Sequence, residues 1–322
     1  MNTSVKPGAL PETPINRARI AETERLIRPH VRRTPVLDVA SEDFGLPFFP
    51  LALKLELFQH TGSFKPRGAF SKLLASQVPP VGVIAASGGN FGLAVAYAAH
   101  TLGHRAEIFV PSTSPRVKAE RIASLGAEVR IVEGYYDEAL EASSVRAEET
   151  SALVMHAYDQ PEVVAGQGTI GAELSEQVSD ADTVVVAIGG GGLIGGIAAW
   201  YEGRARVIGV EPEASHCMSA ALAAGHPVDV PVGGYAADSL GAKRAGMIAF
   251  DVVSRHVERV VLIPDDAIGD AQRRLWDSVR LFAEPGGAAS LAALLSGAYV
   301  PEPHEHVVVL VCGANGDLAA IA

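Results

Sequence analysis

The feature that most constrains the fold of this chain is an uninterrupted apolar run, residues 183–188, which ends directly in glycine. Strands buried on both faces of a parallel sheet read as continuous apolar runs, whereas half-exposed strands alternate. An apolar helix pattern follows at 194–201. Strand, glycine loop and helix in this order predict a βα unit in a parallel sheet. The loop between them contains Gly189, Gly190, Gly191, Gly192 and Leu193.

The same alternation of strand and helix patterns extends over most of the 322 residues. Helices of this length between strands imply parallel pairing with right-handed crossovers. We therefore predict an α/β fold with two three-layer α/β/α lobes and mostly parallel sheets. Residues 1–81 and 160–322 should form a large domain, and residues 82–159 a small, mobile domain.

The predicted strands are 52–57, 81–85, 105–110, 128–132, 152–156, 183–188, 207–210, 260–263 and 307–312. The predicted helices are 15–26, 68–77, 93–102, 115–125, 136–149, 168–178, 194–201, 216–224, 265–282 and 286–295, with a mobile arm at 1–14 and a loop at 225–248.

Composition and charge narrow the class of protein. The net charge is −11, from 26 basic and 37 acidic residues, which argues against a nucleic-acid binder because such proteins present a basic face. The chain is 48% hydrophobic and 20% charged, as in soluble globular proteins, and contains no apolar run that approaches the ~18 residues of a membrane span. The N-terminus shows no apolar signal segment, and Cys217 and Cys312 are too few for a disulfide framework. We expect a cytoplasmic protein without nucleic-acid or membrane partners.

The glycine loop at 189–193 predicts an anion site, because glycines allow close backbone approach and a helix N-terminus offers unpaired N–H groups. The identity of the anion stays open. Gly190, Gly192 and Gly195 match G-x-G-x-x-G, and Glu211 follows about 20 residues later, as in a dinucleotide-binding fingerprint. A nicotinamide-dependent dehydrogenase is therefore one alternative, and glycines needed only for tight packing are another. The dehydrogenase alternative gives no role to the other motifs of the chain.

One lysine stands in an unusual local context. Lys65 lies between Phe64 and Pro66, with Gly62 and Gly68 on either side. Proline disfavours the α region for the residue before it, so we expect Lys65 at a strand-to-helix corner with its amine in a cleft. A partly desolvated lysine has a lowered pKa and can form a Schiff base with an aldehyde. An ordinary surface lysine at a helix start is the alternative.

Two further segments follow predicted strands. Ser87, Gly88, Gly89 and Asn90 precede a helix and present N–H groups, a hydroxyl and an amide, which suit a carboxylate. Helix capping by Ser87 or Asn90 is compatible with that role. Cys312 stands at the carboxyl end of the last predicted strand, where ligands bind in open α/β sheets. Cysteine is also a common core residue, and the segment that follows it reads as a turn.

Taken together, these segments resemble the pyridoxal-phosphate enzymes of the tryptophan-synthase-β type (fold type II), in the branch of the serine/threonine dehydratases and serine racemases. The resemblance covers about residues 15–320, and it is specific because the motifs occur in order with fitting spacing. The segments that carry it are Ser63-Phe64-Lys65-Pro66-Arg67-Gly68-Ala69, Ser87-Gly88-Gly89-Asn90, Gly166-Gln167-Gly168-Thr169, the loop 189–193, and Cys312-Gly313-Ala314-Asn315.

The resemblance implies a role for each matching position. It implies that Lys65 is the Schiff-base lysine and general base, that Phe64 lies against the pyridine ring, and that Asn90 binds the 3′ oxygen of the ring. It also implies that Cys312 faces the pyridine nitrogen and that Glu284 lies near the ring. The cofactor phosphate would bind the N–H groups of Gly189, Gly190, Gly191, Gly192 and Leu193, and the substrate carboxylate would bind Ser87, Gly88, Gly89 and Asn90.

The resemblance implies an ammonia-lyase that converts L-threonine, L-serine or both to a 2-oxo acid and ammonia by α,β-elimination. Pyridoxal 5′-phosphate would be the cofactor, and a homodimer is the expected assembly. A thiol cannot keep the pyridine nitrogen protonated as an aspartate would, which favours elimination over transamination. Another hydroxy amino acid β-eliminase, a serine racemase and a non-catalytic metabolite-binding protein are the alternatives.

The chain departs from the family pattern at two positions. Racemases of this branch carry a serine as second base where this chain has Gly88, so we expect little racemisation. Some members bind a divalent cation through a glutamate, which Glu211 matches, and an aspartate whose place falls on Cys217. Because a thiol is a poor ligand for magnesium or calcium, we expect no metal.

Overall fold

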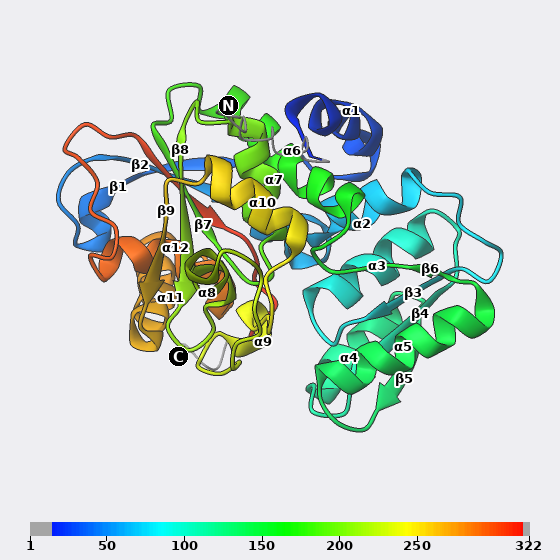
Figure 1. Cartoon of the computed structure of the whole chain (residues 1–322). Coiled ribbons are helices and arrows are strands. Elements are labelled where there is room, and N and C mark those ends of the chain that lie inside the picture. Colours follow the sequence, from blue (N-terminus) through cyan, green and yellow to red (C-terminus); the bar gives the residue numbers. More distant parts are fainter. Residues whose placement is uncertain (1–14, 318–322) are drawn as a thin grey trace, which may run out of the picture.

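The computed structural model of the chain describes residues 15–317 and consists of two lobes, each built around its own sheet (Figure 1). The described residues form a six-stranded sheet and a four-stranded sheet, with helices on both faces of each. The predicted fold class is confirmed. The predicted mobile arm at 1–14 lies outside the described residues.

The six-stranded sheet forms the centre of the larger lobe. Its strands are β1 (Val36–Ala40), β2 (Pro50–Leu55), β7 (Thr183–Ala187), β8 (Arg206–Pro212), β9 (Arg259–Ile263) and β10 (Val307–Val311). The order is β1-β2-β10-β7-β8-β9, and among the described strands of this sheet β1 alone runs antiparallel to its neighbour. Val309 of β10 pairs with Leu53 on one side and with Val185 on the other, so β10 closes the gap between β2 and β7. Every residue of β7 and β10 is buried, as their continuous apolar runs predict.

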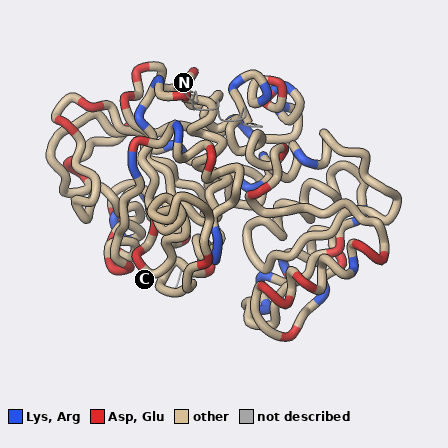
Figure 2. Tube along the Cα trace, viewed as in Figure 1, with Lys and Arg blue, Asp and Glu red and all other residues tan. Residues whose placement is uncertain are grey.

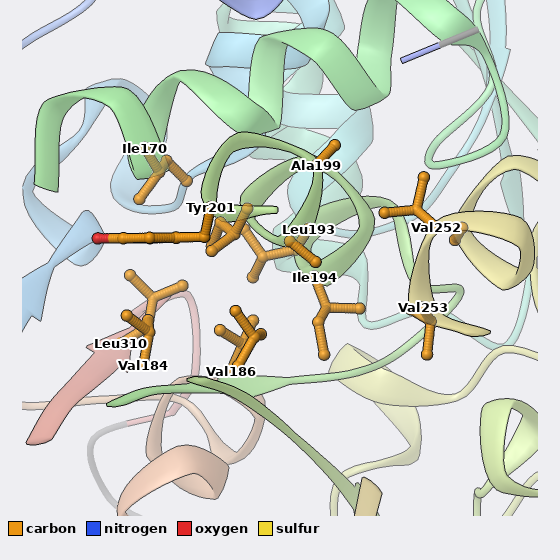
Figure 3. Packing of buried hydrophobic residues seen from close by; sticks show 14 of the residues in the cluster. Ile170, Val184, Val186, Leu193, Ile194, Ala199, Tyr201, Val252, Val253 and Leu310 are labelled. Atoms are coloured by element: carbon orange, nitrogen blue, oxygen red, sulfur yellow. The ribbon is translucent and has the colours of Figure 1, made fainter. Parts of the chain in front are cut away.

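Helices cover both faces of the six-stranded sheet. One core packs Val184, Val186 and Leu310 against the helices drawn above the sheet in Figure 3. The helices of this lobe are α1 (Arg17–Ile27), α6 (Pro161–Gln177), α7 (Gly192–Tyr201), α8 (Cys217–Ala224), α9 (Ala237–Leu240), α10 (Met247–His256), α11 (Asp265–Val279) and α12 (Pro285–Leu295), and short 3₁₀ turns occupy Arg28–His30 (η1), Ser41–Phe44 (η2), Glu56–Phe58 (η3) and His60–Gly62 (η4). The backbones of α6 and α7 pack directly against each other. There is no space for a side chain between them, since a Cβ on Gly196 would overlap the main chain at Gly168.

The four-stranded sheet forms the centre of the smaller lobe and is parallel throughout. Its strands are β3 (Val83–Ala86), β4 (Ala106–Pro111), β5 (Glu128–Val132) and β6 (Leu153–Val154), in the order β5-β4-β3-β6. α3 (Asn90–Thr101) and α4 (Arg116–Ser124) cover one face, and α5 (Tyr136–Thr150) covers the other. α2 (Lys65–Leu74) packs against α3 and α6 and joins the two lobes.

Charged residues of both signs are interspersed over both lobes (Figure 2). Many form exposed ion pairs, such as Arg130 with Glu128 and Arg33 with Glu176. Within the described residues, no helix combines the length and the apolar character needed to traverse a bilayer.

Two elements of the structure, β1 and α10, were not predicted from the sequence. β1 lies at the sheet edge with no fully buried residue, so it lacks the apolar run that marked the other strands. α10 begins within the region predicted as loop and continues beyond it. Its first N–H groups, of Met247 and Ile248, donate to the carboxylate of Asp159 at 3.1 and 3.0 Å. The cap comes from a residue far away in the sequence, so the local pattern does not reveal the helix start.

α2 starts earlier than the helix predicted at 68–77, and Lys65 lies inside it rather than at a corner before it. The helix begins at Lys65 itself, and Phe64 before it is already in the α region with φ −60° and ψ −19°. Pro66 occupies the first helical turn, where its missing N–H has no intrahelical partner to lose. Lys65 is therefore fixed by a helix rather than held outside one.

Candidate active site

The sequence motifs meet in one cavity between the two lobes. The cavity has a volume of about 430 Å³ and lies where β3, β7 and β10 end at their carboxyl edges, as expected for an open α/β sheet. Gly88 and Gly89 belong to the same loop as Ser87 and Asn90 but are not part of the wall. The predicted site residues in the wall are Phe64, Lys65, Ser87, Asn90, Gly189, Gly190, Gly191, Gly192, Leu193 and Cys312.

Lys65 is partly buried, and its amine points into an apolar corner of this cavity. Its Nζ donates a hydrogen bond to the carbonyl oxygen of Ala157 at 3.0 Å and lies 5.0 and 5.7 Å from the ring centroids of Phe64 and Phe91. Burial lowers the pKa of the amine to about 8, against the opposing effect of Cys312 and Glu284. The neutral amine is therefore accessible near neutral pH, which is what Schiff-base chemistry requires.

The glycine loop lines the cavity at the N-terminus of α7. Gly191 has a φ of +94°, and a Cβ there would lie 2.7 Å from the Cβ of Ala249. A Cβ on Gly190 would overlap the ring of Tyr158. Packing thus demands glycine at these positions. This demand is compatible with anion binding, because the same loop presents the first turn of a helix to the cavity.

The amide of Asn90, the first residue of α3, lies between two side chains of the larger lobe. Its Nδ2 donates to Oε1 of Glu284 at 2.6 Å, and its Oδ1 accepts from Nδ2 of Asn315 at 2.7 Å. Burial raises the pKa of Glu284 to about 7, and the hydrogen bond from Asn90 opposes that rise. A carboxyl group with a perturbed pKa beside a lysine in a cavity is typical of a functional site.

Cys312 is buried at the end of β10 and carries a neutral thiol. Its Sγ donates to the carbonyl oxygen of Gly286 at 3.3 Å, and burial raises the pKa of the thiol well above its ordinary value. Its own carbonyl oxygen accepts from the N–H of Phe64 at 3.1 Å. The C-terminal motif is therefore bonded directly to the segment that contains Lys65.

Arg67 anchors the helix that begins at Lys65. Its guanidinium donates to both carboxylate oxygens of Glu56, at 2.8 and 2.7 Å, and to Glu173 at 3.1 Å. Lys54 completes the cluster with a 2.5 Å contact to Glu173. Both cations and both anions are buried. The four side chains, from β2, η3, α2 and α6, form a neutral group that we call the buried charge cluster.

Glu211 does not serve as the ribose-binding residue of a dinucleotide site, because its carboxylate is already hydrogen-bonded within the protein. Its carboxylate accepts from the N–H groups of Met218 and Ser219 at 2.7 and 2.8 Å, so it faces the N-terminus of α8. Cys217 in the same turn donates to the carbonyl oxygen of Gly189 at 3.3 Å. Within the part of the chain that the structure describes, no three His, Cys, Asp or Glu side chains gather as a metal site would require. The dinucleotide fingerprint therefore lacks its acidic partner.

Sequence reasoning missed the far wall of the cavity. Asp238, Ser239, Lys243 and Arg244 line it, and they come from the segment predicted as a loop at 225–248. The length of that segment was the available signal, because loops longer than about 12–15 residues inside a compact domain are commonly functional. Tyr158 also lines the cavity, and no pattern in the sequence marked it.

The two lobes, the partly buried lysine and the glycine loop define an α/β enzyme that binds a phosphorylated aldehyde cofactor. The chain belongs to the family of pyridoxal-phosphate dependent enzymes, whose family model matches residues 27–313. It is 36% identical to the L-threonine ammonia-lyase of Thermotoga maritima over 309 residues, which cover 94% of this chain and 76% of that protein.

Two solved structures are similar to this chain over nearly their whole length. Maize serine racemase has a TM-score of 0.88 and 32% identity, covering 95% of each chain. The T.th. threonine deaminase has a TM-score of 0.87 and 34% identity, covering 94% of this chain and 99% of that one.

The residues of the cavity fit pyridoxal phosphate. The lysine amine has a lowered pKa, the cradle at Gly190 and Gly191 has no room for side chains, and the thiol of Cys312 is neutral. The lysine amine suits the aldehyde, the glycine cradle suits the phosphate, and the neutral thiol suits the pyridine nitrogen.

Proposed function

We propose that this chain is an ammonia-lyase that converts L-threonine, L-serine or both to the corresponding 2-oxo acid and ammonia by α,β-elimination. The observation that carries the proposal is the cavity in which the Lys65 amine, the glycine loop, Asn90 and Cys312 face one another. The similarity to an L-threonine ammonia-lyase and to a threonine deaminase supports the same substrate class.

The proposed binding roles follow from the elements that carry each residue. Lys65 would hold the cofactor aldehyde, and Phe64 would lie against its ring. The N–H groups of 189–193 would bind the phosphate at the start of α7, and Asn90 would bind the 3′ oxygen. The neutral thiol of Cys312 would face the pyridine nitrogen. The backbone of 87–90 would hold the substrate carboxylate.

The bound cofactor supplies an electron sink for the electron pair left on Cα. The protein supplies the remaining chemistry. Once the substrate amine takes its place at the aldehyde, the freed neutral amine of Lys65 would remove the Cα proton, because its lowered pKa leaves it able to accept one near neutral pH. The neutral thiol of Cys312 would not keep the ring nitrogen protonated as a carboxylate would, which favours loss of the β-hydroxyl over transamination. The proton taken from Cα and the β-hydroxyl leave together as one water, and hydrolysis of the released enamine takes up one water, so the net products are the 2-oxo acid and ammonia.

We further propose that residues 82–159 move as a unit over the substrate. Ser87 and Asn90 lie in the smaller lobe and the phosphate loop in the larger one, so the two halves of the site approach each other as the lobes do. Closure would exclude water from the reactive carbon.

The test is a 2-oxo acid and ammonia assay over a panel of hydroxy amino acids, with Lys65→Ala as the control. We expect turnover of L-threonine or L-serine, and we expect Lys65→Ala to lose both turnover and the visible absorbance of the bound cofactor while it stays folded. Pyridoxal-phosphate binding without turnover of any panel member would favour the non-catalytic alternative. D-serine as the main product from L-serine would favour a racemase.

We also propose a homodimer in the cytoplasm. Cys217 and Cys312 are both free thiols, and a reducing compartment keeps thiols in that state. Twofold dimers are the commonest oligomers of soluble enzymes. Light scattering of the purified protein tests the dimer, and cell fractionation tests the compartment.

A further inference from the structure

Asn315 lies at the centre of a chain of hydrogen bonds that crosses between the lobes. The sequence places Asn315 in a turn and at the end of the Cys312-Gly313-Ala314-Asn315 segment, without a role of its own. Its Oδ1 accepts from Nη1 of Arg121, in α4 of the smaller lobe, at 2.8 Å. Its Nδ2 donates at 2.7 Å to two acceptors, the carbonyl oxygen of Thr61 and Oδ1 of Asn90. The chain then continues from Nδ2 of Asn90 to Glu284 at 2.6 Å.

The chemistry of its partners fixes which way the Asn315 amide points. A guanidinium can only donate a hydrogen bond, and a backbone carbonyl can only accept one. The oxygen of Asn315 must therefore face Arg121, and its nitrogen must face Thr61. The opposite orientation would set donor against donor and acceptor against acceptor.

The orientation of Asn315 in turn fixes that of Asn90. Because an N–H group of Asn315 faces Asn90, the Asn90 side chain must present its oxygen there and its NH₂ group to Glu284. This holds whether Glu284 is protonated or ionised, since a carboxyl oxygen accepts in both states. The NH₂ group has two hydrogens, so it can serve Glu284 and a cofactor oxygen together.

The backbone around Asn315 is shaped to hold it in this place. Thr61 has a φ of +61°, a conformation that is rare for a residue with a branched side chain. Gly62 has a φ of +78°, and a Cβ on it would lie 2.9 Å from Oδ1 of Asn315. The N–H of Ala314 donates to the carbonyl oxygen of Gly62 at 2.9 Å. The two loops are thus bonded to each other, with space for the Asn315 amide.

We propose that Asn315 is a positioning residue that fixes the amide of Asn90 with its NH₂ group toward the cofactor oxygen. The proposal rests on the proposed cofactor-binding role of Asn90. It gives a function to a residue that touches neither the substrate nor the reacting atoms.

The test compares Asn315→Asp, Asn90→Ala and the double variant as holoenzymes. Asn315→Asp keeps the size of the side chain and the contact with Arg121 but removes both N–H donors, so the Asn90 amide should reverse. We expect each single variant to weaken pyridoxal-phosphate binding about ten-fold or more and to shift the visible absorbance band in the same direction. The double variant should match Asn90→Ala within about two-fold, because residues that act as one unit are not additive. Asn16→Asp, the same change at the N-cap of α1, should change neither quantity.

The outcomes separate this proposal from the assignment on which it rests. Normal cofactor affinity in Asn90→Ala would refute the role of Asn90 and this inference with it. A large effect of Asn90→Ala together with no effect of Asn315→Asp, or with fully additive effects, would refute the role of Asn315 alone. If thermal unfolding shows that Asn315→Asp does not fold, Asn315→Ala takes its place under the same additivity criterion, since it removes the donors without adding a charge.

Discussion

At the scale of single residues, an apolar setting makes Lys65 a candidate nucleophile. Its amine lies among Phe64, Phe91 and the carbonyl oxygen of Ala157, with Cys312 and Glu284 as the acidic groups that affect its charge. Solvation of the charged form is lost there, so the pKa falls to about 8. The consequence is a pH dependence that an exposed lysine would not show.

Loading of pyridoxal phosphate onto the apoenzyme should follow the neutral fraction of Lys65. The pKa is lowered, so the neutral form dominates above about pH 8 and is lost as pH falls below it. We expect the loading rate to rise about ten-fold from pH 6 to pH 7 and to level off above about pH 8. Stopped-flow absorbance measures this rate. A rate that still climbed ten-fold per unit up to about pH 10 would indicate an ordinary lysine pKa.

Gly88 should determine the ratio of elimination to racemisation. A Cβ on Gly88 would overlap Oγ of Ser114 and lie 2.8 Å from its Cβ, so Gly88→Ser needs Ser114→Gly beside it to make room. A positioned proton donor is worth on the order of 10²–10⁴-fold. Chiral chromatography of the L-serine reaction should find D-serine near background for the unchanged enzyme and a raised ratio of D-serine to 2-oxo acid for the double variant.

Ser114→Gly alone is the matched control for that experiment and should not raise D-serine. Abundant D-serine from the unchanged enzyme would refute the expectation. The hydroxyl of Ser114, which lies next to Gly88, would then be the first group to replace.

At the scale of elements, the buried charge cluster joins α2, α6, β2 and η3, and thereby fixes the helix whose first residue is Lys65. Each cation is matched by an anion within hydrogen-bonding distance. Such a group adds little over apolar packing, but it is costly to break, because removal of one partner leaves an uncompensated buried charge.

Arg67→Met should therefore destabilise the protein strongly. It removes the nearest cation of Glu56 and one of the two cations of Glu173, and we expect a loss of about 3–5 kcal/mol in the free energy of unfolding. Arg33→Gln, which breaks the exposed pair with Glu176, should cost about 0–1 kcal/mol. Urea denaturation measures both. Equal costs would mean that the cluster does not hold α2 in place.

The sequence predicted those elements and site residues whose signals are local. β7 and β10 are continuous apolar runs, and Lys65 and the glycine loop stand out through their neighbours in the chain. The start of α10 depends on a carboxylate from residue 159, and β1 pairs at an exposed edge. The roles of Asn315 and of the wall at 238–244 arise only when distant segments meet. Those features are properties of the tertiary structure.

At the scale of the whole molecule, polar contacts at exposed positions bridge the two lobes. Lys118 pairs with Asp238, and Lys243 pairs with Asp137 at 3.1 Å. Exposed ion pairs contribute about 0–1 kcal/mol each and are screened by salt. Bridges of this strength are compatible with the proposed motion of residues 82–159.

Substrate binding should shift the lobes toward closure. Crystals of the holoenzyme with and without a non-reactive amino acid should differ in the angle between the two sheets, because the proposed carboxylate-binding loop and the proposed phosphate loop belong to different lobes. X-ray scattering in solution should report the same change. Equal angles in both crystals would contradict the proposed motion of residues 82–159.

The central place of β10 has a consequence for how the chain is made. The smaller lobe is continuous in sequence from β3 to β6, so it can complete its sheet soon after it leaves the ribosome. β2 must wait for β10 before it meets the rest of its sheet, and both β2 and β7 expose an unpaired edge until then. Open strand edges invite misassembly and chaperone binding. Nascent chains arrested before residue 307 should therefore yield a protease-resistant smaller lobe, while the larger lobe is digested.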